Sequence, residues 1–184
     1  SPDYNGIVSL QCHPMTSREQ VRNDFLRQKN MNQGILLVND FDNLKELKQC
    51  ANEWANELNT IPIVVITMHR YCRINRNRMK FPPNTPLSEI MDVVASYSHI
   101  IIFALRLASR GLSYVTSDYS RHITHQIVKD KPYINYIQSM RILGNYQDTN
   151  PLHIYTQNPE FFEKTKNKWE HIHNSIIGNI QFNI

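Results

Sequence analysis

Short apolar runs alternate with longer amphipathic stretches along the chain. Most of the runs are continuous, which is typical of parallel strands covered on both faces. Five of them predict strands, at residues 34–38, 63–67, 99–104, 133–137 and 153–155. Because neighbouring parallel strands need a crossover connection, a helix is expected between successive strands.

The amphipathic stretches supply these helices. The stretch after Asp42 carries Leu47, Cys50 and Trp54 on one face, as a helix packed on a core does. Five helices are predicted, at residues 16–28, about 43–58, about 85–97, 118–129 and from 158 to 173 or 177.

Polar residues mark three of the expected helix starts. Thr16 and Glu19 have the spacing of a capping box, in which each side chain bonds to the other's free backbone N–H. Asp42 is expected to cap the second helix. Thr85 is expected to cap the third, with Pro86 at its first position.

The alternation predicts an α/β fold, namely a flavodoxin-like three-layer α/β/α sandwich with a five-stranded, mainly parallel sheet. At 184 residues, with 41% hydrophobic and 20% charged residues, the chain is expected to form one domain over residues 1–184. The start, Ser1-Pro2-Asp3, indicates a fragment of a longer protein. No apolar run approaches the roughly 18–20 residues that span a bilayer, so no membrane contact is expected.

The cysteines indicate the compartment. Cys12, Cys50 and Cys72 are an odd, scattered set without CxxC spacing, which suits neither a disulfide framework nor a zinc site. We interpret them as free thiols of a soluble protein in the reducing interior of the cell.

The positive charge of the chain is local. The net charge is +4 and the pI is near 9.0, yet no acidic residue occurs between Glu57 and Glu89. That interval contains five cations, Arg70, Arg73, Arg76, Arg78 and Lys80, so the remainder of the chain sums to about −1. Such a cluster is typical of a surface that binds a polyanion.

Ligands of open α/β sheets bind beyond the carboxyl ends of the strands. Two loops expected there, Met68 to Pro83 and Leu105 to Ser117, are strongly cationic. Guanidinium groups bind phosphate bidentately and stack on bases, and Tyr offers a stacking face, so RNA is the expected partner. The predicted RNA-binding residues are Arg70, Tyr71, Arg73, Arg76, Arg78, Lys80, Arg106, Arg110, Arg121 and His122. A small phosphate-bearing ligand, a solvated loop and a protein-binding surface remain alternatives.

Motifs for catalysis are degenerate or missing. Without a GxGxxG loop or a GxSxG elbow, neither a nucleotide cofactor nor a conventional serine nucleophile is expected. The turn Asn39-Asp40-Phe41 follows the first apolar run, where an SGNH (GDSL-type) hydrolase has Gly-Asp-Ser, and Phe41 cannot act as a nucleophile. Ala104-Leu105-Arg106-Leu107 stands where that family has its oxyanion-binding Gly-x-Asn-Asp, and it offers no amide side chain.

Several other polar residues have simpler interpretations. Glu170 and His173 have the spacing of a terminal acid–histidine pair, but they fall inside a predicted helix. His122 and His125 are one helical turn apart without a third metal ligand, so they are expected on a partly exposed helix face. Asp40 is expected in a turn. No catalytic residue, metal or cofactor is predicted.

Together, the Asn39-Asp40-Phe41 turn, the His69-Arg70-Tyr71-Cys72-Arg73 segment and the Ala104-Leu105-Arg106-Leu107 turn resemble the OSK domain family, the C-terminal domains of the Oskar proteins of insect germ plasm. The resemblance would cover the chain from about Tyr4 onward. It implies an SGNH-hydrolase-like fold without a complete catalytic set, which binds germ-plasm mRNA through basic surface residues. It further implies a developmental role in cytoplasmic ribonucleoprotein granules, alongside other germ-granule proteins, in mRNA localisation.

The leading hypothesis is therefore a pseudoenzyme that binds the 3′-untranslated regions of mRNA and contributes to ribonucleoprotein assembly. One alternative is an active SGNH-type hydrolase with atypical residues, using Asp40 or Ser109 with His69 or His173. The other is a protein-interaction scaffold that uses the apolar residues Ile74, Met79 and Phe81.

Overall fold

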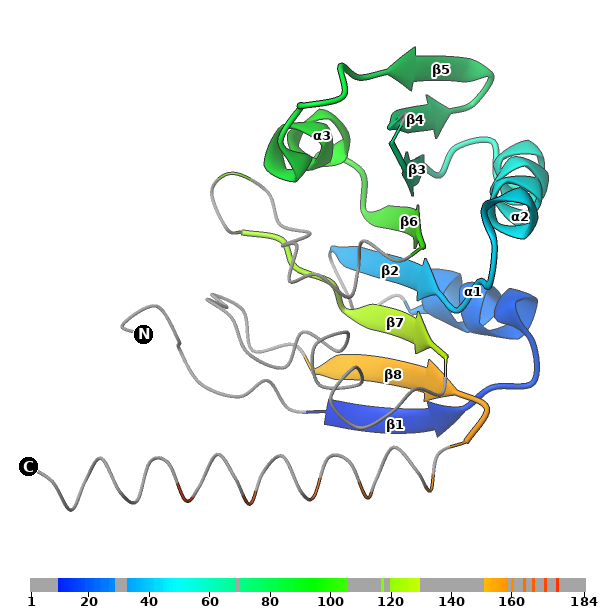
Figure 1. The fold of residues 1–184 in the computed structure, drawn as a ribbon, viewed down its shortest axis with the longest axis vertical. Helices are drawn as coiled ribbons and strands as arrows, with labels where there is room; N and C mark the ends of the chain where they lie inside the picture. Colours follow the sequence, from blue (N-terminus) through cyan, green and yellow to red (C-terminus); the bar gives the residue numbers. More distant parts are fainter. Residues whose placement is uncertain are drawn as a thin grey trace, which may run out of the picture.

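An eight-stranded sheet forms the centre of the described chain, in the order β1-β8-β7-β2-β6-β3-β4-β5 (Figure 1). The computed structural model describes residues 10–28, 33–68, 70–105, 117, 120–129 and 151–158, and single positions at 160, 164, 167, 171 and 175. The strands are β1 (Leu10–Pro14), β2 (Gly34–Asn39), β3 (Ile63–Ile66), β4 (Tyr71–Ile74), β5 (Asn77–Lys80), β6 (His99–Ala104), β7 (His125–Val128) and β8 (Leu152–Thr156).

Six neighbouring strands of the sheet run parallel, namely β1, β8, β7, β2, β6 and β3. The strands β4 and β5 add an antiparallel hairpin at one edge. The predicted α/β class and mainly parallel sheet are confirmed. The expected number of five strands is wrong, because β1, β4, β5 and β7 were missed. Residues 133–137, predicted as a strand, lie outside the described residues.

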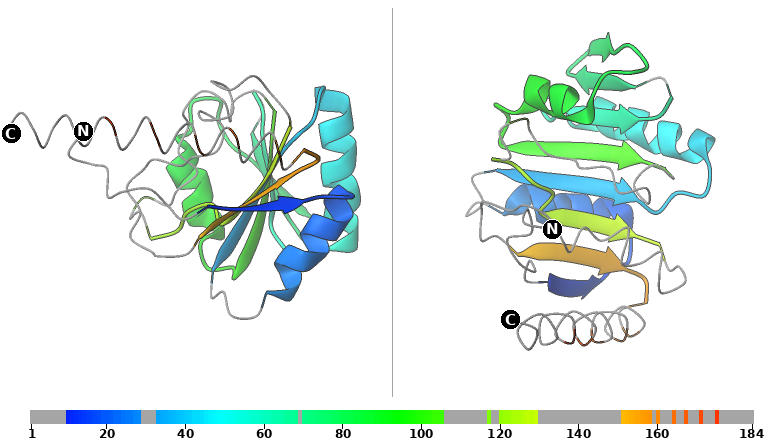
Figure 2. Two further views of the ribbon diagram at one scale, coloured as in Figure 1. Left: turned by 90° about the horizontal axis from the view of Figure 1, so that it is seen from below. Right: turned by 60° about the vertical axis from the view of Figure 1, so that its left-hand side comes forward.

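Three helices pack on the sheet, α1 (Arg18–Arg27), α2 (Leu44–Glu57) and α3 (Leu87–Val94). The two views of Figure 2 show α1 and α2 on one face and α3 on the other. Phe25 of α1 and Trp54 of α2 belong to one buried apolar cluster, and Ile90 of α3 belongs to a second cluster across the sheet. The predicted apolar faces of α2 and α3 are thereby confirmed.

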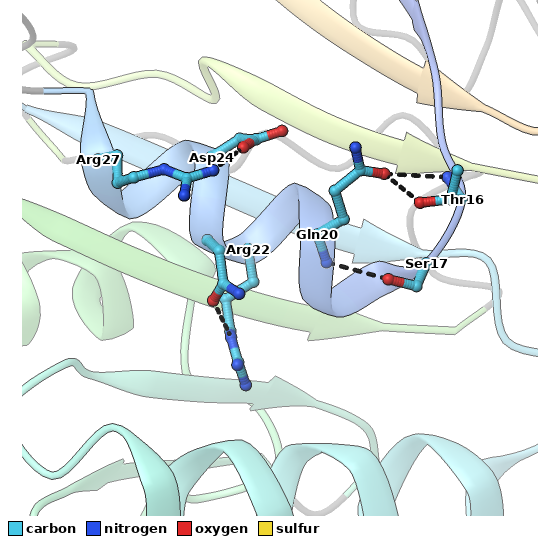
Figure 3. A network of polar contacts seen from close by, with 7 residues as sticks. Thr16, Ser17, Gln20, Arg22, Asp24 and Arg27 are labelled. Carbon is cyan, nitrogen blue, oxygen red and sulfur yellow. Dashed lines mark hydrogen bonds and ion pairs between the residues drawn. The ribbon is translucent and has the colours of Figure 1, made fainter.

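The helix caps lie one residue away from their predicted positions. Ser17, and not Thr16, caps α1, since its hydroxyl accepts from the Gln20 N–H at 3.1 Å (Figure 3). Asn43, and not Asp42, caps α2 by accepting from the Glu46 N–H at 2.9 Å.

The third helix begins without a side-chain cap. Pro86 occupies the capping position, and the Thr85 hydroxyl turns back to donate to the Pro82 carbonyl at 2.8 Å. The prediction of a Thr cap followed by Pro in the first turn is therefore wrong by one residue.

The helix predicted at 118–129 is wrong. Residues 121–124 form no regular element, and β7 follows between β2 and β8. All four residues of β7 are buried, and its Ile127 and Val128 have high strand propensity, so pairing on both sides outweighs the helical spacing.

The closing helix is confirmed at its described positions, Glu160, Lys164, Asn167, His171 and Ser175, which are all helical and exposed. Within the described residues, no helix combines the length and apolar character needed to cross a bilayer.

Candidate nucleic-acid interface

The predicted cationic loop from Met68 to Pro83 contains a regular β-hairpin, in which β4 and β5 are joined by Asn75 and Arg76. We call residues 71–80 the basic hairpin. Asn75 has a φ of 55°, the left-handed conformation that Asn tolerates and that a two-residue hairpin turn requires. This turn is not apparent in the sequence, because Asn-Arg lacks the usual glycine.

The strand pairing places the cations of the basic hairpin on one face. Arg73 lies directly opposite Arg78, and Tyr71 lies opposite Lys80. Tyr71 packs in the cluster beneath α2, and Arg73 donates to the side-chain oxygen of Asn56 in that helix at 2.6 Å. The cationic face of the hairpin is therefore continuous with the α2 side of the sheet.

No carboxylate within the described part of the chain forms an ion pair with the basic hairpin. The four ion pairs among the described residues join Arg18 to Asp40, Arg22 to Glu57, Arg27 to Asp24 and Lys129 to Asp42. None of them includes a hairpin residue. The only ring contact of a hairpin cation in the described part of the chain is that of Arg78, whose guanidinium carbon lies 3.9 Å from the Tyr71 ring centre.

The hairpin cations are also accessible. β5 is the last strand of the sheet, and all four of its residues are exposed. Arg76 in the turn is exposed, and Arg73 is half-buried. The structure thus brings Arg73, Arg76, Arg78 and Lys80 together at one edge of the sheet, and none of them forms an ion pair within the described residues.

Tyr71 does not have the role predicted for it. Its side chain is 3% exposed, its ring is covered by Arg78, and burial raises its pKa. It cannot offer a stacking face to a base, and it anchors the basic hairpin to the core instead. The side chains that the protein-scaffold alternative relied on, Ile74 and Phe81, pack partly against the α3 cluster, while Met79 is 39% exposed.

Arg121 and His122 also differ from the prediction, since they are only 2% and 5% exposed. The Arg121 guanidinium donates to backbone carbonyls of Gly34, at the start of β2, and of Ser98, just before β6, at 3.1 and 3.2 Å. It therefore lies at the amino ends of the strands, away from the predicted rim, and ties elements together. Arg106 and Arg110 lie outside the described residues.

The Asn39-Asp40-Phe41 turn, compared with a hydrolase turn on sequence alone, is occupied by structural contacts. With its side-chain amide turned so that the nitrogen faces them, Asn39 donates to the carbonyls of Ala104 and Leu105, at 2.9 and 2.6 Å. Asp40 pairs with Arg18 at 2.9 Å, and the same guanidinium lies 3.9 Å from the ring centre of Phe41, which is 8% exposed. Phe41 is thus a core aromatic side chain.

Asp42 lies on the rim beside this turn and is bound by Lys129 at the end of β7. The hydrogen bond and charge of Lys129 lower the pKa of Asp42. Two carboxylates on one turn, Asp40 and Asp42, are thus each held by a different cation. Asp42, with its lowered pKa, lacks the raised pKa of a general acid. His69, Ser109, Glu170 and His173, named for catalysis by sequence, lie outside the described residues.

A cavity of about 610 Å³ opens at the carboxyl end of β3. Its described lining is mostly apolar and includes one charged side chain, that of Arg70, which is half-buried and donates to the Thr85 carbonyl. Met68 at its rim is 77% exposed. The described lining residues are Leu44, Ile66, Thr67, Met68, Arg70, Pro83, Asn84 and Leu105. Ligand binding at this rim was predicted from the sequence, but the cavity itself was not.

A second feature missed by sequence is a stack of histidines beneath α1. His153 of β8 lies between His13 and His125, with ring centres 5.2 and 4.7 Å away, and Nε2 of His13 lies 2.9 Å from Nδ1 of His153. Phe25 contacts His125 edge-on from α1, at 5.0 Å. The only signal in the sequence is that His125 and His153 begin short apolar runs.

The stack favours neutral imidazoles. Burial, and then the neighbouring His153, His13 and His99, lower the pKa of His125 to about 3. The ring is fully buried, and its Nε2 has no hydrogen-bond partner among the described residues. The rings are stacked on one another, an arrangement unlike that of ligands around a shared metal ion. The described residues contain no group of three or more side chains suited to a metal.

The three cysteines are free thiols, as predicted. Burial raises the pKa values of Cys50 and Cys72 to about 12, so neither is a reactive thiolate at neutral pH. No protein-family model matches the sequence, and a comparison with curated proteins gives no match. The geometry of the site therefore carries the functional argument.

Proposed function

We propose that the chain is an RNA-binding domain with an SGNH-hydrolase-like fold, which lacks a working catalytic set and contacts single-stranded RNA through the basic hairpin. What supports the proposal most is the pairing of Arg73 with Arg78. Like charges directly opposite each other on antiparallel strands destabilise a sheet. Here the pair joins the inner strand β4 to the edge strand β5, and neither cation has a carboxylate partner among the described residues. An anionic ligand would remove this repulsion.

A surface of guanidinium groups is better suited to binding phosphate groups than to holding diffuse counter-ions. Each Arg offers a planar set of donors that binds two phosphate oxygens together. Residues two apart on a strand lie about 7 Å from each other, so Arg78 and Lys80 repeat along β5 in the manner of a track. An extended single strand can follow such a track, whereas a lone phosphate would use only part of it.

A simpler role for cations on an edge strand is to prevent edge-to-edge aggregation. That role accounts for Arg78 and Lys80 on β5. It does not account for Arg73, which lies on the inner strand β4, opposite another cation.

The absence of catalysis is proposed from the turn after β2. Asp40 is bound by Arg18, and Phe41 is packed in the core where a hydrolase has its serine. A hydrolase would need a nucleophile from elsewhere, and a panel of ester and phosphodiester substrates tests this. Turnover that disappears on His69→Ala would favour the hydrolase over the pseudoenzyme.

The resemblance to the OSK domain family extends the proposal to a cellular setting. On that basis the partner is germ-plasm mRNA, bound in its 3′-untranslated region within cytoplasmic ribonucleoprotein granules. Contacts to phosphate groups position a protein on RNA without distinguishing one base sequence from another, so the hairpin alone would give modest sequence selectivity.

The test is the binding of a fluorescently labelled single-stranded RNA, followed by anisotropy. The variant carries Arg73→Glu, Arg76→Glu and Arg78→Glu. Reversing three contacts is expected to weaken binding by about 100-fold or more at moderate salt.

A matched control carries Arg27→Glu, Lys129→Glu and Lys164→Glu, which change the net charge equally at exposed positions outside the hairpin. We expect this control to retain most of the affinity. Equal losses in both variants would mean that net charge, and not the hairpin, drives binding. Unchanged binding by the hairpin variant would refute the assigned surface.

A further inference from the structure

We propose that the cavity at the carboxyl end of β3 receives one unstacked nucleobase of the bound RNA strand, with Arg70 holding the adjoining phosphate. The inference rests on the proposed RNA binding and goes beyond it by assigning a site for a base.

The size and lining of the cavity suit a small, mostly apolar group. Its volume of about 610 Å³ falls within the range of roughly 300–1,000 Å³ for ligand sites. Leu44, Ile66, Pro83 and Leu105 supply apolar walls. A duplex cannot insert a paired base into such a cavity, whereas a single strand can splay one out.

Met68 supports an apolar occupant. Its side chain is 77% exposed, more than any other exposed large hydrophobic residue in the described part of the chain. Methionine adapts its flexible, polarisable side chain to varied surfaces and contacts aromatic rings favourably. A base lying against it would cover apolar area that is otherwise left in water.

The polar groups of the cavity suit a nucleotide. Arg70 uses its guanidinium for one bond to the Thr85 carbonyl, and the other donors of this group have no partner among the described residues. The amide of Asn84 lies in the lining and is likewise unbonded within the described chain. An Asn amide can donate to and accept from the polar edge of a base, while Arg70 holds an anion beside it.

The cavity adjoins the open end of the basic hairpin through Arg70, which immediately precedes β4. The Arg70 carbonyl accepts from the Phe81 N–H at 3.1 Å, so Phe81 lies across from Arg70, and Lys80, opposite Tyr71, is the first hairpin cation from that end. A strand whose phosphates follow Lys80 and Arg78 along β5 therefore reaches Arg70 and the cavity at one end. The base enters where the cationic track ends.

The experiment compares a 12-residue oligouridylate with inorganic polyphosphate of similar length, which has the charge without the bases. In the wild-type protein, ¹³C-labelled methionine methyl groups are followed by NMR. We expect the RNA to shift the Met68 methyl resonance and polyphosphate to leave it nearly unchanged.

Two matched variants complete the test. Met68→Ser removes the apolar contact at an exposed position and should weaken oligouridylate binding by about fivefold. Met79→Ser makes the same change on the face of the basic hairpin opposite Arg78 and Lys80, and it should leave the affinity unchanged. Polyphosphate should bind all three proteins equally.

The outcomes separate the two proposals. If RNA binds through the hairpin but neither shifts the Met68 methyl nor distinguishes Met68→Ser from Met79→Ser, the cavity is not a base site and the proposed function stands. If RNA does not bind the wild-type protein at all, the proposed function and this inference both fail.

Discussion

Arg73 on β4 lies directly opposite Arg78 on β5, and the guanidinium of Arg78 lies over the ring of Tyr71 in place of a carboxylate. The cation–π contact and the bond from Arg73 to Asn56 direct the two guanidiniums toward different partners. Two like charges are thereby held opposite each other on one face of the hairpin, an arrangement that destabilises a sheet.

Arg73→Glu should separate stability from binding. The change converts a like-charge pair into an opposite-charge pair and should raise the free energy of unfolding by about 0.5 kcal/mol. It should at the same time weaken RNA binding by about tenfold. Urea denaturation and anisotropy measure the two effects, and a variant that is less stable and binds equally well would contradict the account.

Arg121 is expected to matter for folding and not for RNA contact. Its guanidinium is 2% exposed and donates to backbone carbonyls of Ala95, Tyr97, Gly34 and Ser98. Arg121→Met removes these four hydrogen bonds and should cost about 2–4 kcal/mol of stability. The folded fraction should bind RNA with unchanged affinity.

Arg27→Met is the control for this prediction, because Arg27 is exposed and its pair with Asp24 is a surface pair. It should change stability by less than about 0.5 kcal/mol. If Arg121→Met instead folded normally and lost RNA affinity, the residue would belong to the interface after all.

The cap of α2 gives a direct test of the corrected helix start. Asn43→Ala removes the acceptor for the Glu46 N–H and should destabilise the protein by about 1 kcal/mol. Asp42→Ala removes an exposed pair with Lys129 and should have a smaller effect. Chemical denaturation of the two variants measures their unfolding free energies. A larger loss in Asp42→Ala than in Asn43→Ala would mean that Asp42 is the cap.

The histidine stack predicts a loss of stability in acid. The ordinary pKa of 6.5 applies to His125 in the unfolded chain, and the folded value is about 3. The unfolded state therefore binds the proton first, and the contribution of His125 is fully present above pH 6.5 and is lost as the pH falls toward 3. The loss reaches about 5 kcal/mol at most.

His125→Phe keeps a ring in the stack and removes its titration, so the dependence of unfolding free energy on pH between 6.5 and 4 should flatten. The same change at His171, an exposed helical position, should leave that dependence as it is in the wild type. An unaltered profile in His125→Phe would show that other groups cause the acid sensitivity.

The sequence predicted those parts of the fold in which pattern and burial agree. The continuous runs of β2, β3 and β6 lie in the middle of the sheet, where both faces are covered, and α2 shows a clear apolar face around Trp54. β7 was taken for a helix because Arg121, His122 and His125 are polar and helically spaced. Their burial depends on backbone carbonyls and ring stacking, which no local pattern contains.

The candidate site was predicted in part. Composition identified the cations of residues 70–80, because they occur in an interval without acidic residues. It could not show that Asn75 turns the chain back on itself, or that the pairing register sets Arg73 against Arg78 and buries Tyr71. The cavity beside Arg70 is lined by Leu44 at the start of α2, Asn84 before α3 and Leu105 after β6, which are far apart in the sequence, so no local pattern indicates it.

The salt dependence of RNA binding tests the central claim most directly. Each phosphate contact to a single strand contributes about −0.7 to the slope of log K against log salt concentration, so four hairpin cations predict a slope of about −3. In the variant with Arg73→Glu, Arg76→Glu and Arg78→Glu, the slope should fall to −1 or less in magnitude, roughly in proportion to the lost contacts. A wild-type slope near zero, or a slope that the substitutions leave unchanged, would contradict an RNA interface on the basic hairpin.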